Sequence, residues 1–191
     1  MTRRFYGLVL GGGLVTALAI TALAVTVFAG AGGAGGNKTM VKADMLTGYQ
    51  EATPAGVSSD ASGTFSATID EDASPPNITY TLTYVGLSGP ALFSHIHFGN
   101  RYDSGGISTF LCGGSTKPAC PAGTTTEATV TGTIIPSDVI GPASQGIGPG
   151  DFAKLVDAIR SGVTYVNVHT PLFPAGEIRG QINNDSQRQV P

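Results

Sequence analysis

Apolar and hydroxyl side chains alternate through the middle of this chain, and this pattern restricts the fold more than any other feature. Thr and Ser alternate with Phe65, Ala67 and Ile69, and the segment 78–84 alternates Thr with Ile, Tyr and Leu. Successive side chains of a strand point to opposite faces, so each segment predicts a strand with one apolar face. The acidic, Ser- and Pro-containing segment 70–77 predicts the turn between them.

The same alternation recurs further along the chain. It predicts strands at 128–134, 166–169 and 178–182, with weaker signals at 41–46, 92–98 and 106–111. Seven or eight short strands joined by Gly- and Pro-containing turns predict an all-β fold, an antiparallel β-sandwich or barrel.

One short helix interrupts the strands. Its apolar positions have the helical spacing i, i+3, i+4 and i+7, and they are Phe152, Leu155, Val156 and Ile159. Gly162 stands where a left-handed stop is expected. We interpret the apolar stripe as core packing.

The N-terminal segment differs in kind from the rest. Arg3 and Arg4 precede the uncharged segment 5–29, which as a helix would reach about 37 Å and span a bilayer. The sequence Ala29-Gly30-Ala31 also offers a small-residue cleavage site, so a signal peptide and a retained membrane anchor both fit. Either one exports the remainder, because the two arginines stay on the cytoplasmic side. We therefore expect an extracellular or cell-surface protein.

Composition divides the chain into four parts. We predict a signal peptide or anchor at 1–29, a flexible Gly/Ala linker at 30–37, a β-sandwich domain at 38–183 and a disordered tail at 184–191.

Charge and motifs exclude several classes of function. Ten Lys and Arg against 13 Asp and Glu give a net charge of −3, with no basic footprint for nucleic acid. The sequence contains neither a P-loop glycine-lysine motif nor a dinucleotide-binding G-x-G-x-x-G between a strand and a helix, so we expect no nucleotide. It also has no nucleophile-elbow motif of a serine hydrolase.

The only two cysteines, Cys112 and Cys120, flank a short loop rich in Gly, Ser and Pro. In an exported chain this pair predicts a disulfide. Closing so small a ring should contribute ~2 to 3 kcal/mol to stability on the loop-entropy model. A metal-thiolate site would need more soft ligands than the sequence supplies.

All three histidines fall in two strand segments, residues 94–98 and 166–170. By alternation His95 and His97 point to one face of their strand and Ile96 points to the opposite face. In the other strand Val166 and Val168 point into the core, and His169 points outward. If the two strands are neighbours, three neutral imidazoles converge outside the apolar interior. Such a site suits Zn(II), Cu(II), Ni(II) or Fe(II), and copper or zinc is the cofactor expected.

Further polar residues could complete the site. Asp103 or Glu177 could supply a fourth ligand, or the position could be open to water. Asn167 could be a ligand or only a local hydrogen-bond partner. Glu177 and Arg179 fit a structural ion pair; alternatively, Glu177 accepts a hydrogen bond from a histidine N–H and Arg179 steers an anion. The alternative for the histidines themselves is that they are buried, hydrogen-bonded and purely structural.

Several motifs together resemble the chordin-type (CHRD) domain, over about Val41 to Ile182. They are Ala61-Ser62-Gly63-Thr64, Tyr80-x-Leu82-x-Tyr84-x-Gly86-Leu87, His95-Ile96-His97-x-Gly99, the helix ending at Gly162, Tyr165-Val166-Asn167-Val168-His169-Thr170, and Gly176-Glu177-Ile178-Arg179-Gly180-Gln181. The resemblance implies an extracellular antiparallel β-sandwich of immunoglobulin-like or superoxide-dismutase-like character. Animal chordins use such modules while binding secreted growth factors, whereas stand-alone prokaryotic members have no established activity.

The His-x-His pair and the disulfide are also faintly similar to copper/zinc superoxide dismutase. That enzyme binds its copper through four histidines, whereas this chain has three in all. The similarity therefore does not extend to dismutation by the same site.

Three functions follow from these features. The first is a non-catalytic envelope module that binds one transition metal through His95, His97 and His169. The second is an adhesion module with structural histidines and an extracellular protein partner, touching the membrane only through its N-terminal segment. The least favoured is a three-histidine metalloenzyme, because no general base stands out.

Overall fold

The computed structural model describes residues 38–53 and 55–184. The elements, in chain order, are β1 (Lys38–Thr47), η1 (Gly48–Gln50), β2 (Ser62–Asp70), β3 (Asn77–Val85), β4 (Phe93–Phe98), β5 (Gly106–Cys112), β6 (Ala128–Ile134), η2 (Pro136–Asp138), η3 (Ala143–Gln145), α1 (Phe152–Arg160), β7 (Thr164–His169), β8 (Ile178–Gln181) and β9 (Asn183–Asn184). The prediction of an antiparallel all-β domain with one short helix is confirmed.

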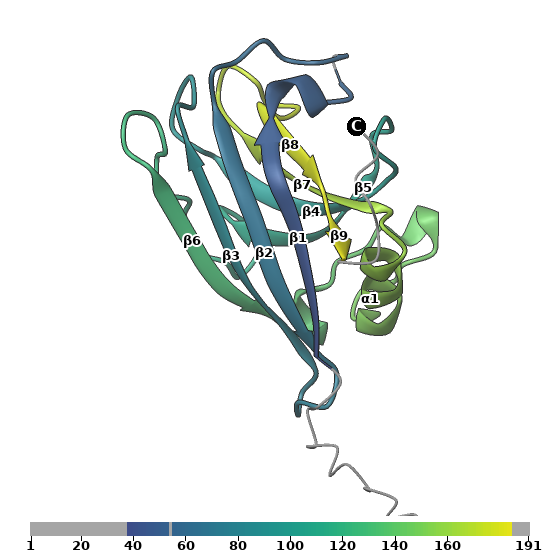
Figure 1. Ribbon diagram of the computed structural model, residues 1–191. Coiled ribbons are helices and arrows are strands. Elements are labelled where there is room, and N and C mark those ends of the chain that lie inside the picture. Colours follow the sequence, from purple (N-terminus) through teal and green to yellow (C-terminus); the bar gives the residue numbers. More distant parts are fainter. Residues whose placement is uncertain (1–37, 54, 185–191) are drawn as a thin grey trace, which may run out of the picture. The chain divides into compact units, whose positions relative to one another are not determined.

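All nine strands belong to one sheet. Its order is β5-β4-β7-β8-β1-β2-β3-β6, and β9 pairs with β1. In Figure 1, β6, β3, β2 and β1 form the near side, and β4, β5 and β7 run behind them. The sheet is nearly closed and barrel-like, whereas a sandwich has two separate sheets. The strands β5-β4-β7-β8 and the strands β1-β2-β3-β6 form one continuous sheet because β1 pairs with β8 at Thr47 and Arg179.

Alternation in the sequence becomes burial in the structure. In β2 and β3 the apolar positions are buried and the Thr and Ser positions are mostly exposed or half-buried. Ile96, Val166 and Val168 are fully buried in the same core cluster, on the face of β4 and β7 that points inward. The polar residues that alternate with them along β4 and β7 must therefore point to the outer face of the sheet.

The helix packs as its spacing predicts. The four residues of its apolar stripe, Phe152, Leu155, Val156 and Ile159, all belong to the core cluster. Asp151 caps the first turn by accepting a hydrogen bond from the backbone N–H of Lys154. Gly162 follows the helix in a left-handed conformation, with φ of 71°.

The N-terminal hydrophobic segment, the linker and the C-terminal tail lie outside the described residues, apart from Asn184 in β9. In the described part of the chain, no helix is long and apolar enough to cross a membrane.

Candidate metal centre

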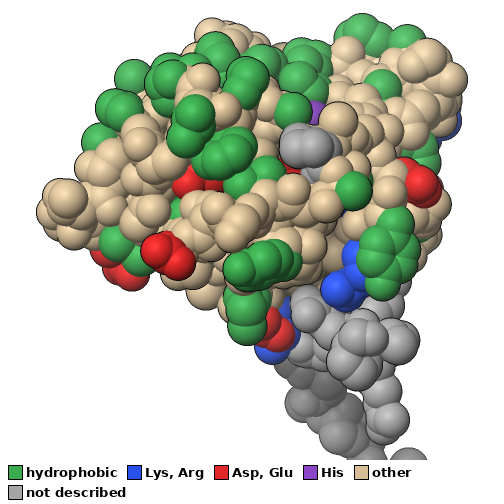
Figure 2. Space-filling view, turned by 90° about the horizontal axis from the view of Figure 1, so that it is seen from above, with side chains coloured by type: hydrophobic (Ala, Val, Ile, Leu, Met, Phe, Trp, Pro, Cys, Tyr) green, Lys and Arg blue, Asp and Glu red, His purple; other side chains and the backbone are tan. Residues whose placement is uncertain are grey.

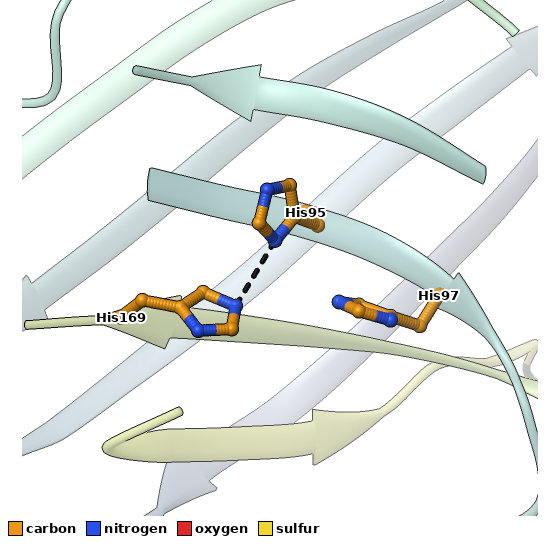
Figure 3. Close-up of side chains that lie close together, drawn as sticks. All are labelled: His95, His97 and His169. Carbon is orange, nitrogen blue, oxygen red and sulfur yellow. Dashed lines mark hydrogen bonds between the residues drawn. The ribbon is translucent and has the colours of Figure 1, made fainter. Parts of the chain in front are cut away.

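Strand pairing brings the three histidines together. β4 and β7 are antiparallel neighbours, with His95 opposite Asn167 and His97 opposite Tyr165. His169 lies two residues from Asn167 on the same face, so its ring reaches the same space. One ligand atom from each imidazole lies within 4.8 Å of the others. Figure 3 shows the His95 and His169 rings joined by a hydrogen bond and the His97 ring directed toward them.

The site is buried although it lies on the outer face of the sheet. The side chains of His95, His97 and His169 are 4%, 7% and 7% exposed. On the face seen in Figure 2, histidine is visible as a small purple area between other atoms. The three histidines therefore lie on the face of the sheet opposite the apolar core, as predicted. They are nevertheless buried, because loops cover this face.

Two backbone carbonyls fix the tautomers of His97 and His169. The Nδ1 atom of His97 lies 2.9 Å from the Gly105 carbonyl oxygen, and Nδ1 of His169 lies 3.0 Å from that of Pro174. A carbonyl only accepts, so each Nδ1 carries the proton and each neutral ring keeps a lone pair on Nε2. A carbonyl that fixes the outer N–H in this way is the usual arrangement behind a metal-binding histidine.

The free lone pairs converge without enough donors to satisfy them. Nε2 of His97 is buried and has no hydrogen-bond partner. Nε2 of His169 faces Nδ1 of His95 at 3.0 Å and Oδ1 of Asn167 at 2.9 Å. The amide oxygen cannot donate a proton, and His95 can supply only one. A cation at this point would satisfy these atoms together.

Burial keeps the three rings neutral. The pKa of His95 is lowered to about 3, chiefly by burial and in addition by the neighbouring His169 and His97. Burial also lowers the pKa of His97 to about 4, although the bond to Gly105 opposes the shift. The pKa of His169 is lowered by burial as well, against the bond to Pro174. Neutral imidazoles are the form that binds metal ions.

Tyr165 and Arg179 build the cover of the site. The Tyr165 ring stacks on His97 with centroids 4.8 Å apart, and the Arg179 guanidinium lies 3.4 Å from the Tyr165 ring centroid. Arg179 donates hydrogen bonds to the backbone oxygens of Asn100 and Asp103 at 2.6 and 2.9 Å. The buried guanidinium thus fastens the loop that carries the Gly105 carbonyl.

Glu177 and Asp103 lie apart from the histidine cluster, which contains no carboxylate among the described residues. The Glu177 carboxylate accepts four hydrogen bonds, from Ser59 Oγ, Ser88 N, Ser88 Oγ and Thr170 Oγ1. The exposed Asp103 carboxylate accepts from the Asn100 amide. The expected Glu177–Arg179 ion pair does not form, because each residue packs against a different loop.

Sequence analysis missed Glu51. It follows η1, is 6% exposed, and lies beside Gly176 and the Asn167 amide. Burial raises the pKa of Glu51 to about 7, while Arg179 and a hydrogen bond from Asn167 oppose the shift. Nothing local in the sequence marks this residue, because its neighbours are more than a hundred positions away. By contrast, the sequence could have predicted that Tyr165 lies on the same face as His169, because the two residues are an even number of positions apart in one strand.

The predicted disulfide is present and joins Cys112 of β5 to Cys120. It closes the loop after β5, the strand that pairs with the histidine strand β4.

Comparison with known proteins places the chain in a family. A family model described as CHRD domain matches residues 43–182, so the chain belongs to the CHRD domain family. No curated protein and no solved structure matches the chain.

Proposed function

We propose that this protein is an exported CHRD-domain module of the cell envelope that binds one zinc or copper ion through His95, His97 and His169. The observation that carries the proposal is the buried Nε2 atom of His97, which has no partner and faces the other two imidazoles. Leaving such an acceptor unsatisfied costs about 1 to 3 kcal/mol, and a metal ion would recover that cost.

The oxygen of Asn167 is the best candidate for a fourth ligand, since it already lies 2.9 Å from Nε2 of His169. Four protein donors would close the coordination sphere, which is typical of a structural or storage site rather than a catalytic one. Ligands of a tetrahedral zinc ion lie about 3.4 Å apart, given bonds of about 2.0–2.1 Å. To reach this spacing the 3.0 Å contact between His95 and His169 and the 2.9 Å contact of Asn167 would lengthen, whereas ligand atoms up to 4.8 Å apart would move closer.

Metal titration tests the proposal. The full-length chain, stripped with a chelator, should bind about one equivalent of zinc or copper in a competition assay. His97→Ala removes a ligand and should weaken binding by at least about 100-fold, more than loss of an outer-shell partner. Ser66→Ala, on an exposed position of β2, serves as the control and should bind as the parent does.

Circular dichroism of both variants checks that the fold persists. Stoichiometric binding that survives in His97→Ala, or no stoichiometric binding in the parent, would contradict the proposal. The second outcome would favour structural histidines in an adhesion module.

A further inference from the structure

The side-chain amide of Asn167 lies between the histidine cluster and Glu51. Asn167 is 2% exposed, and its Oδ1 atom lies 2.9 Å from Nε2 of His169. The nitrogen edge of the amide faces Glu51, to whose carboxylate Asn167 donates a hydrogen bond. One amide therefore presents its oxygen to the candidate metal centre and its N–H groups to a buried carboxylate.

The amide oxygen faces an acceptor while the site holds no metal ion. Nδ1 of His169 donates to the Pro174 carbonyl oxygen, so Nε2 of the neutral ring carries a lone pair. The contact with Oδ1 of Asn167 thus brings two acceptors together. Reversing the amide end for end would place an N–H group at Nε2 and replace this repulsion by a hydrogen bond. Another group must hold the amide against the preference of the histidine.

Glu51 is that group. In a reversed amide the oxygen would face the carboxylate, which only accepts hydrogen bonds when it is ionised. The loss of a hydrogen bond costs more at a charged group than at a neutral one. The amide can satisfy only one of its two neighbours, so the charged Glu51 determines the orientation rather than the neutral imidazole of His169.

The backbone around Glu51 fixes the carboxylate in place. The backbone N–H of Glu51 donates to the Gly48 carbonyl oxygen at 3.1 Å, and its carbonyl oxygen accepts from the Gly56 N–H at 2.9 Å. Gly176 leaves the space in which the carboxylate and the amide meet, because a Cβ there would lie close to both groups. Glu51 is therefore a fixed, buried partner of Asn167 and not a mobile surface group.

We infer that Glu51 is a positioning residue, which holds the Asn167 oxygen toward the histidines and so keeps a fourth donor ready for the metal ion. This inference rests on the proposed metal function, and it adds a residue outside the coordination sphere that determines the affinity. Groups that orient a metal ligand from outside the coordination sphere typically change metal affinity by about 10- to 100-fold.

Zinc titration of the full-length chain at pH 8 tests this role. Glu51→Met keeps the length of the side chain but removes both acceptor oxygens, so the amide should reverse and zinc affinity should fall by at least about tenfold. The same change in an Asn167→Ala background should weaken binding by less than about twofold, because no amide is left to orient. A carboxylate that attracted the ion only through its charge would have the same effect in both backgrounds.

Nitrogen NMR of the imidazole rings in the metal-free chain gives a readout that does not depend on binding. A reversed Asn167 amide donates to Nε2 of His169, so the resonance of this atom should shift in Glu51→Met. Glu127→Gln, at an exposed position, is the control and should change neither zinc affinity nor the resonance.

Circular dichroism checks that each variant is folded. Glu51→Gln keeps the shape of the side chain and one acceptor oxygen, so it should give smaller changes in the same direction, and it takes the place of Glu51→Met if that variant does not fold.

The inference is overturned if the folded Glu51 variants bind zinc as the parent does, if the loss is equal in the Asn167→Ala background, or if the His169 Nε2 resonance does not move. A parent chain that binds no zinc would contradict the metal proposal instead. The Nε2 resonance would then still decide whether Glu51 orients the amide.

Discussion

The Nδ1 atom of His95 lies 3.0 Å from the Nε2 atom of His169, across the pairing of β4 with β7. Two imidazolium ions at this distance would repel each other strongly in a buried setting. Because Nδ1 of His169 already donates to Pro174, its Nε2 can only accept from His95 while both rings are neutral. The pair is therefore held in the neutral form that a metal ion requires.

Acid should destabilise the metal-free domain. Unfolded histidines take up protons near pH 6.5, whereas folded His95 and His97 do so only near pH 3 and 4. The unfolded state therefore binds more protons below pH 6.5, and stability falls as the pH drops. Each such histidine contributes on the order of 1.4 kcal/mol per pH unit in this window.

Glu51 acts in the opposite direction, because its raised pKa of about 7 makes the folded state bind the extra proton between pH 7 and 4.5. One carboxyl offsets only one of the histidines, so the net effect keeps its sign. Urea unfolding of chelator-treated protein should give a lower free energy of unfolding at pH 5 than at pH 6.5. Equal or greater stability at pH 5 would show that the rings are not buried neutral.

Gly176→Ala should damage the site from outside the histidine cluster. Gly176 has φ of 133°, and an added Cβ would lie 2.3 Å from Oε1 of Glu51 and 2.8 Å from Nδ2 of Asn167. We expect a loss of about 1 to 3 kcal/mol in the free energy of unfolding. Metal affinity should fall as well, because Asn167 is displaced from His169.

Gly148→Ala is the control for this change, since a Cβ there meets nothing within 4 Å. Thermal unfolding and zinc titration of the two variants make the comparison. Indistinguishable behaviour of the two would mean that the contact around Gly176 is not as close as described.

Glu177→Gln should destabilise the fold without removing a metal ligand. Burial raises the pKa of Glu177, but hydrogen bonds from Ser59, Thr170 and Ser88 outweigh it, so the pKa is lowered. A glutamine amide nitrogen cannot accept, so two of the four hydrogen bonds that the carboxylate receives lose their acceptor. We expect a loss of about 2 to 4 kcal/mol, measured by urea unfolding.

Glu127→Gln, at an exposed position, should change stability by less than about 0.5 kcal/mol. A similar small effect for Glu177→Gln would argue that the four hydrogen bonds contribute little.

Local periodicity explains what the sequence could predict. The alternation around Ile96 and Val168 determines which face each histidine occupies, because the period of a strand is a property of the backbone. Strand neighbours are harder to predict, since the pairing of β4 with β7 joins residues about seventy positions apart.

Loop contacts explain what the sequence could not predict. Whether Arg179 meets Glu177 or the loop at 100–103 depends on tertiary packing, and no pattern near either residue reveals it. The same is true of Glu51, which reaches the site only through the fold of the loop after η1. The closure of the two halves into one sheet likewise depends on the β1–β8 pairing.

X-ray absorption spectroscopy of the full-length chain loaded with one equivalent of zinc measures the proposed coordination directly. The spectrum should contain the multiple scattering of three imidazoles, with nitrogen donors at about 2.0–2.1 Å, and should lose one imidazole in His97→Ala. A spectrum dominated by oxygen ligands, or one unchanged in that variant, would contradict the assignment of the three histidines as the metal centre.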